Sequence, residues 1–240
     1  MQHEAYELLA GTGPVLITCE HASLRLPDPW AWPPDDHRLV GSHWSYDLGA
    51  EDLSRQLNAA TGWPTVLARF SRLLIDANRQ LDSPELCRRQ AGVRPVRLNQ
   101  GLHPDERQRR IDGYWTPYHD AIDKQLEVRR DLVAIHSFTD VYERQRRTLE
   151  IGVLFNHDEP EAHAMAEVIA DAGYRVRLNE PYTGKGGDLF SADVHAQHHG
   201  CRALELEIRQ DLLLDPTWTE RFLPTLIRSV HQALDISTSL

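Results

Sequence analysis

The sequence has few cysteines and no long apolar run. Its 240 residues include only three cysteines, Cys19, Cys87 and Cys201, at wide spacing. An odd number of distant cysteines indicates reduced thiols rather than a disulfide framework. No apolar stretch approaches the ~20 residues that a membrane span requires, and the first residues lack the basic leader and apolar segment of a secretory signal. We therefore expect a protein without membrane attachment that works in the cytoplasm.

Positive charge is also scarce. The 26 Lys and Arg residues against 36 Asp and Glu residues give a formal net charge of −10, which argues against nucleic acid as the main partner. No serine lies in the Gly-x-Ser-x-Gly turn of serine hydrolases, and the glycine-rich stretch 184–187 lacks the Lys-Ser/Thr of a phosphate-binding loop. Serine-hydrolase and nucleotide-binding chemistry are therefore not expected.

What is present is an alternation of apolar strand and helix patterns along the whole chain. Strands are predicted at 15–19, 64–68, 73–75, 132–135, 149–155, 174–178 and 201–208, and helical segments at 47–60, 105–130, 160–172 and 217–234. The alternation predicts a single three-layer α/β domain over residues 1–240, with a mixed, mostly parallel sheet and helices on both faces.

Three segments interrupt this alternation. Residues 27–34, which include Trp30 and Trp32, and residues 80–104, which are rich in arginine, are predicted as long loops. Long loops in a small domain are often functional, so we expect both to form walls of a substrate pocket. The glycines of residues 179–187 allow backbone conformations closed to other residues and suggest a mobile flap.

Two predicted strands end in histidine. The strand at 132–135 leads into His136, and the strand at 15–19 leads into Glu20 and His21. Because sites in open α/β sheets form beyond the carboxyl ends of strands, these histidines can converge. A zinc hydrolase uses three protein ligands and leaves one position open. The third ligand is Asp47 or Glu20, and the alternative role for Asp47 is to cap the helix that follows.

A second cluster of polar residues follows the strand pattern at 64–68. Arginine forms two parallel hydrogen bonds with a carboxylate and Asn can add donors, so Asn78 and Arg79 are a candidate clamp for an anionic substrate. Arg72 could polarise a substrate carbonyl. The alternative is that Asp76 pairs with Arg72 or Arg79 in a surface network.

The segment 204–209 carries two carboxylates on one face. Strand alternation places Glu205 and Glu207 together and the apolar residues on the opposite face. Two buried like charges raise each other's pKa, which suits a general base that takes a proton from water. The alternative is an edge strand whose glutamates face solvent.

The remaining histidines carry weaker signals. His195, His198 and His199 could form a second metal site, although an exposed helix end is the favoured interpretation. His119 belongs to an aromatic helical segment and is a candidate neighbour of the pocket.

These motifs, taken in order, match a known family. The ordered set is Glu20-His21-Ala22-Ser23, Asp47-x-Gly49-Ala50, Ser71-Arg72 with Asp76-x-Asn78-Arg79, Tyr118-His119, His136-Ser137-Phe138, Asn179-x-Pro181-Tyr182-x-Gly184 and Glu207-Ile208. From about residue 14 to residue 214 the chain resembles the N-formylglutamate amidohydrolases, and it is more distantly similar to zinc carboxypeptidases and aspartoacylase-like deacylases.

The resemblance implies a fold like that of zinc exopeptidases and one divalent zinc ion as cofactor. It also implies that His136 binds zinc and that Glu207 is the general base. Arg72 would polarise the carbonyl and Asn78-Arg79 would bind a substrate carboxylate. Asn179 and Tyr182 are further candidates for substrate binding. The chain departs from carboxypeptidases at His-x-x-Glu, because Leu24 stands where the glutamate is expected.

The function expected from this resemblance is removal of an N-formyl or small N-acyl group from an acidic amino acid, with N-formyl-L-glutamate as the leading substrate and histidine breakdown as the pathway. One alternative is a carboxypeptidase or cell-wall amidase that uses the same residues. Another is a protein that binds an acidic metabolite without catalysis. The partner is then a small acidic N-acyl amino acid, and the oligomeric state stays open.

Overall fold

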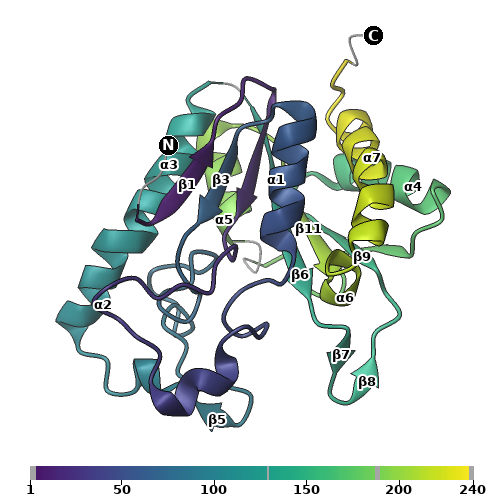
Figure 1. Cartoon of the computed structure of the whole chain (residues 1–240). Helices are drawn as coiled ribbons and strands as arrows, with labels where there is room; N and C mark the ends of the chain where they lie inside the picture. Colours follow the sequence, from purple (N-terminus) through teal and green to yellow (C-terminus); the bar gives the residue numbers. More distant parts are fainter. Residues whose placement is uncertain (1–3, 129, 187–189, 238–240) are drawn as a thin grey trace.

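The computed structural model describes residues 4–128, 130–186 and 190–237. A seven-stranded sheet, in the order β1-β3-β2-β6-β11-β9-β10, runs through the molecule (Figure 1). Its strands are β1 (Tyr6–Leu9), β2 (Val15–Cys19), β3 (Thr65–Ala68), β6 (Asp131–Phe138), β9 (Ile151–Leu154), β10 (Val176–Leu178) and β11 (Ala203–Arg209).

The sheet is mixed and mostly parallel, as the sequence predicts. Strands β3, β2, β6 and β11 are parallel to one another, whereas β1 pairs antiparallel with β3, and β9 pairs antiparallel with β11. The carboxyl ends of the four parallel strands therefore meet at one edge of the sheet, which we call the carboxyl edge. The opposite edge is the amino edge.

Helices cover both faces of the sheet. One apolar core joins α1 (Ala50–Thr61), α4 (Glu159–Asp171) and α7 (Pro216–Ala233) to side chains such as Ile17, Val133 and Leu206. A second core joins α3 (Thr116–Leu126) and α5 (Phe190–His199) to the other face. Helices α1 and α7 lie on the side opposite α3 in Figure 1. The fold is thus the three-layer α/β arrangement expected from the alternating pattern, and its description as one catalytic domain stays a prediction.

Several predicted elements differ in the structure. The helical region predicted at 105–130 comprises α2 (Pro104–Arg110), a π-helical turn (Ile111–Trp115) and α3. The strand predicted at 73–75 is wrong: these residues form a turn in which Leu74 N–H donates to Ser71 O. They are apolar because they are buried, and burial alone does not distinguish a packed turn from a short strand. Strand β1 and helix α5 were not predicted.

The loops predicted beside the site contain short ordered elements. Residues 80–104 include the hairpin of β4 (Gln90–Ala91) and β5 (Arg94–Pro95) and a 3-10 turn (Arg97–Asn99). A 3-10 helix (Pro34–Leu39) follows the tryptophan-containing loop, and a second hairpin joins β7 (Val141–Tyr142) to β8 (Gln145–Arg146). The last short element is α6 (Gln210–Leu213).

Cys19, Cys87 and Cys201 are free, and the first two are buried. Cys201 lies before β11 rather than inside it. Among the residues that the structure describes, no helix combines the length and apolar character needed to cross a bilayer.

Candidate active site

His21 and His136 meet at the carboxyl edge. Strand β2 leads into His21 and the adjacent parallel strand β6 carries His136. Their ring centroids are 4.8 Å apart, and each residue is only 2% exposed. The convergence expected from the two strand ends is therefore present.

Asp47 joins these histidines from the loop before α1. Its N–H donates to His21 O at 2.9 Å, while Oδ2 lies 2.9 Å from His136 Nδ1 and accepts from Ser137 N–H at 3.1 Å. Helix α1 is capped instead by Gly49, which has φ +80° and no room for a Cβ against Leu213. The helix-cap role considered for Asp47 is thus wrong. One ligand atom each from His21, Asp47 and His136 lies within 4.8 Å of the others.

Each histidine contacts a carboxylate through Nε2, the ring nitrogen that does not face Asp47. His21 Nε2 lies 2.7 Å from Asp76 Oδ1, and His136 Nε2 lies 3.0 Å from Glu20 Oε2. Carboxylates accept, so both Nε2 atoms carry hydrogen and both Nδ1 atoms face Asp47. His21 Nδ1 is buried without a hydrogen-bond partner in the described chain. Two supported imidazoles and a carboxylate, with one nitrogen unsatisfied, fit a zinc ion.

Glu20 occupies a supporting position. Besides His136, its Oε1 accepts from Ser191 Oγ at 2.9 Å. Burial alone would raise the pKa of Glu20, but the hydrogen bond and charge of His136 lower it to about 2. The same balance, in which burial is outweighed by interactions with His21 and His136, holds the pKa of Asp47 below its ordinary value. Between the two carboxylates left open by the sequence, the geometry favours Asp47 as the ligand.

Asp76 is the residue whose role the sequence did not reveal. The predicted pairing with Arg72 is present, with Nη2 3.0 Å from Asp76 Oδ2, but Asp76 is only 2% exposed and so is not part of a surface network. Burial would raise the pKa of Asp76, but Arg72 and His21 hold it well below its usual range. The Asp-x-Asn-Arg motif was the available signal for this position.

Arg72 and Asn78 are tied to the same network. Arg72 Nη1 lies 3.3 Å from Asp47 Oδ1, so this guanidinium links Asp47 to Asp76. Asn78 Oδ1 accepts from Ser191 N–H at 2.9 Å, which turns the amide nitrogen toward Glu205 Oε2 at 3.5 Å. Helix α5 therefore fixes the orientation of the asparagine.

Arg79 follows on the same loop and is half-buried. Its Nη1 donates to Asn78 O at 2.7 Å. The carboxylate clamp of Asn78 and Arg79 stays a prediction.

Glu205 and Glu207 lie on a central strand. Because β11 pairs with both β6 and β9, the edge-strand alternative is wrong. Glu207 is the register partner of His136, and the two glutamates are 4% and 6% exposed. Burial raises the pKa of Glu207 well above its ordinary value, and the charge of His136 only partly offsets this. Within the described chain, Glu207 Oε2 has no hydrogen-bond partner.

His136, Glu205 and Glu207 form a second group whose ligand atoms lie within 4.8 Å of one another. His136 Nε2 already faces Glu20 there, so this group is the poorer metal site. A buried, unpaired carboxylate beside the ligands suits proton transfer better.

The two flap candidates have different surroundings. Asn179 has φ +52°, and its Oδ1 accepts from Phe155 N–H and Gly184 N–H. The Asn179 side chain thus shapes the loop, and substrate binding by it stays a prediction. Tyr182 is 46% exposed and faces Arg147. Gly187, at the end of the predicted flap, lies outside the described residues.

The other histidines form a separate chain of contacts. His119 Nδ1 lies 2.7 Å from His195 Nε2, and Asp123 Oδ1 contacts His195 and His199 at 2.7 and 2.8 Å. His195 is buried, so the exposed helix end predicted for these histidines is wrong at that position, while His198 is exposed. The described residues show no metal-like grouping here.

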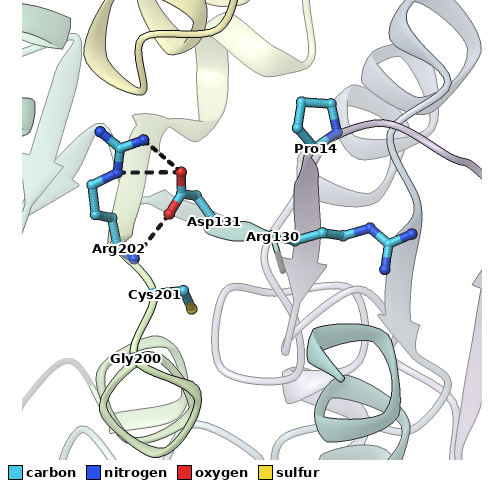
Figure 2. Close-up of a pocket in the computed structure, with 6 residues that line it drawn as sticks. All are labelled: Pro14, Arg130, Asp131, Gly200, Cys201 and Arg202. Carbon is cyan, nitrogen blue, oxygen red and sulfur yellow. Dashed lines mark hydrogen bonds and ion pairs between the residues drawn. The ribbon is translucent and has the colours of Figure 1, made fainter. Parts of the chain in front are cut away.

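A cavity of about 540 Å³ opens at the amino edge (Figure 2). Its lining residues are Pro14, Arg130, Asp131, Gly200, Cys201 and Arg202. Arg202 and Asp131 pair with each other at 2.7 Å, and burial raises the pKa of the Cys201 thiol to about 11, which disfavours the reactive thiolate. The cavity lies at the opposite edge of the sheet from His21 and His136.

Comparison with known proteins identifies the family of this chain. Residues 13–214 match the family model of N-formylglutamate amidohydrolase. The chain belongs to that family. An N-formylglutamate deformylase of Pseudomonas putida is 28% identical over 238 residues, which cover 86% of this chain and 84% of the relative.

Solved structures agree in fold. A gene product of Agrobacterium tumefaciens has a TM-score of 0.90 at 31% identity, covering 97% of this chain and 95% of that one. An N-formylglutamate amidohydrolase of Ralstonia eutropha has a TM-score of 0.71 at 18% identity, with 97% and 100% covered. The chain is therefore an amidohydrolase with the predicted α/β fold, and the alternative of a non-catalytic binding protein loses its support.

Proposed function

We propose that this amidohydrolase is a zinc-dependent deformylase that converts N-formyl-L-glutamate and water into formate and L-glutamate. The observation that carries the proposal is the buried grouping of His21, Asp47 and His136 next to an unpartnered Glu207. The family and the deformylase of Pseudomonas putida support the choice of substrate.

His21 and His136 would hold zinc through Nδ1, and Asp47 would hold it through its carboxylate. Bound there, zinc would supply a Lewis acid that polarises the amide carbonyl and makes water more acidic. Asp76 and Glu20 keep each Nε2 protonated and thereby direct the Nδ1 lone pairs inward. The charge of Arg72, held by Asp47 and Asp76, lies where it can stabilise negative charge on the carbonyl oxygen.

Glu207 would transfer the proton. In this step the water oxygen bonds to the formyl carbon while Glu207 takes a proton from water. The C–N bond then breaks as the same proton passes to the leaving nitrogen of glutamate. A raised pKa makes Glu207 a stronger base than an exposed carboxylate, which suits both halves of this transfer.

Asn78 and Arg79 would bind one substrate carboxylate, and Tyr182 with the 179–186 loop would border the pocket. We further propose that the enzyme acts in histidine breakdown, because N-formylglutamate is the substrate implied by the family name. We also propose that it works in the cytoplasm.

Formate release tests the proposal directly. Purified protein would be assayed with N-formyl-L-glutamate as isolated, after chelation, and after zinc is added back. We expect release to stop with chelation and to return with zinc. Release that persists in fully metal-free protein would contradict zinc dependence, and no release in any state would contradict the substrate.

A further inference from the structure

Arg147 lies among three aromatic rings near the end of β6. Its guanidinium carbon is 5.3 Å from the ring centre of Phe138, 4.8 Å from that of Tyr142 and 5.7 Å from that of Tyr182. The rings come from β6, from the hairpin of β7 and β8, and from the 179–186 loop. Phe138 is two residues beyond His136, so this guanidinium is placed from the same strand end as the candidate metal site.

The charge of Arg147 is not neutralised by a carboxylate. Among the residues with described positions it forms no ion pair. Its Nη1 donates to Thr139 O and Oγ1, and a side-chain hydrogen bond with Tyr182 helps to lower the pKa of that tyrosine. Arg72 is held by Asp47 and Asp76, and Arg88 is paired with Glu85 at 2.9 Å. A guanidinium has five N–H donors, which is more than the contacts with Thr139 and Tyr182 use, so donors remain for a ligand.

Arg147 shares neighbours with Glu207 and with Arg72. Burial raises the pKa of Tyr182, the charges of Glu207 and Asp47 raise it further, and Arg147 lowers it. The pKa of His43 is lowered by burial and by the nearby charges of Arg72, Arg147 and Arg88. Arg147 and Glu207 therefore both act on Tyr182, and Arg147 and Arg72 both act on His43.

We propose that Arg147, together with the Tyr182 hydroxyl, binds a second carboxylate of the substrate and makes the enzyme selective for dicarboxylic N-acyl amino acids. The inference rests on the proposed function, in which the substrate carries an α- and a side-chain carboxylate. Asn78 and Arg79 take one of them, and Arg147 takes the other. The aromatic rings fix the plane of the guanidinium, which favours paired hydrogen bonds to a carboxylate.

A pair of substrates that differ only in the second carboxylate tests the proposal. N-formyl-L-glutamate and N-formyl-L-glutamine would be assayed with wild-type protein and with Arg147→Gln. Because a hydrogen bond to a charged group is lost, we expect KM for N-formyl-L-glutamate to rise about 10- to 100-fold with kcat little changed. Turnover of N-formyl-L-glutamine should stay within about twofold of the wild-type value, since it lacks the partner charge.

Arg146 provides the matched control. It is the preceding residue on the same hairpin, its side chain is 73% exposed, and its partner is Asp211 at 3.5 Å. Arg146→Gln should leave KM for both substrates unchanged. Equal losses for both substrates in Arg147→Gln, or no loss for either, would overturn the proposal.

A second measurement keeps the two hypotheses separate. Arg147→Lys retains the positive charge and takes the place of Arg147→Gln if that variant does not fold. Its KM for N-formyl-L-glutamate should exceed the wild-type value, but by less than the increase expected for Arg147→Gln. Calorimetric titration of glutarate, a dicarboxylate without the amide, should show the same fold-weakening in the Arg147 variants without any turnover. If glutarate binding depends on Arg147 but wild-type protein releases no formate from N-formyl-L-glutamate, the deformylase function alone is rejected. If the affinity for glutarate is the same in wild-type protein and in the Arg147 variants, this inference alone is rejected.

Discussion

The charged groups at the two edges of the sheet differ in whether they have hydrogen-bond partners. At the amino edge there is a cavity of about 540 Å³, but Arg202 pairs there with Asp131 (Figure 2). Arg130 donates to main-chain oxygens. At the carboxyl edge His21 Nδ1 and Glu207 Oε2 are buried without hydrogen-bond partners in the described chain. A folded protein leaves such atoms unsatisfied at a cost of about 1–3 kcal/mol each, so they indicate a ligand or a reaction. Two unsatisfied ionisable groups that both adjoin His136 therefore mark the site better than cavity volume does.

The largest expected effect is loss of the metal from an Asp47→Ala variant. Asp47 is the carboxylate that faces Nδ1 of both histidines, whereas Glu20 only supports His136. Asp47→Ala should lose stoichiometric zinc and activity together, and Glu20→Gln should weaken zinc binding by only about 10- to 100-fold. Zinc content after dialysis, with affinity measured by chelator competition, would check this. A greater loss in Glu20→Gln than in Asp47→Ala would make Glu20 the ligand.

The next effect separates catalysis from stability. Glu207→Gln should keep zinc and lower kcat by about 10²- to 10⁴-fold, the usual contribution of a general base. Because the buried carboxylate is unpartnered, the neutral amide should leave the stability to denaturant equal or higher. Wild-type turnover in this variant would show that Glu207 is not the base.

The protonation of His136 should make zinc affinity depend on pH, which is a smaller effect than the loss of a ligand or of the general base. Burial lowers its pKa, but Glu205, Asp47 and Glu20 raise it well above the ordinary value, which favours the protonated form of His136 in the metal-free protein. Zinc requires the Nδ1 lone pair, and binding must therefore release a proton. Zinc affinity should rise about tenfold per pH unit above the ordinary histidine pKa of about 6.5, until the raised pKa is reached. Affinity that is independent of pH between 6.5 and 8 would contradict this protonation state.

The sequence predicted those parts of the site that depend on strand geometry. His21 and His136 follow from parallel strands that end together, and the alternation of β11 places Glu205 and Glu207 on one face. These rules need only the direction and period of a strand.

Other parts depend on contacts that no local pattern contains. Asp76 is four residues from Arg72, so their pairing was predictable, but its contact with His21 spans 55 residues. Ser191, whose hydroxyl holds Glu20 and whose N–H holds Asn78, lies on α5, a helix without a clear apolar period. The choice between Asp47 and Glu20 needed the fold of the loop before α1, which one sequence does not determine.

The smallest expected effect lies at the amino edge. Arg202→Gln removes an ion pair whose side chains are 30% and 21% exposed, so solvent already screens it, and we expect a loss of only about 1 kcal/mol in the free energy of unfolding. The ratio kcat/KM should be unchanged, because none of the cavity-lining residues is among those that form the candidate active site. Urea denaturation and steady-state kinetics on the same preparation would measure both. A fall in kcat/KM with no fall in stability would mean that the amino edge takes part in function, and satisfied hydrogen bonding would then no longer distinguish the two edges.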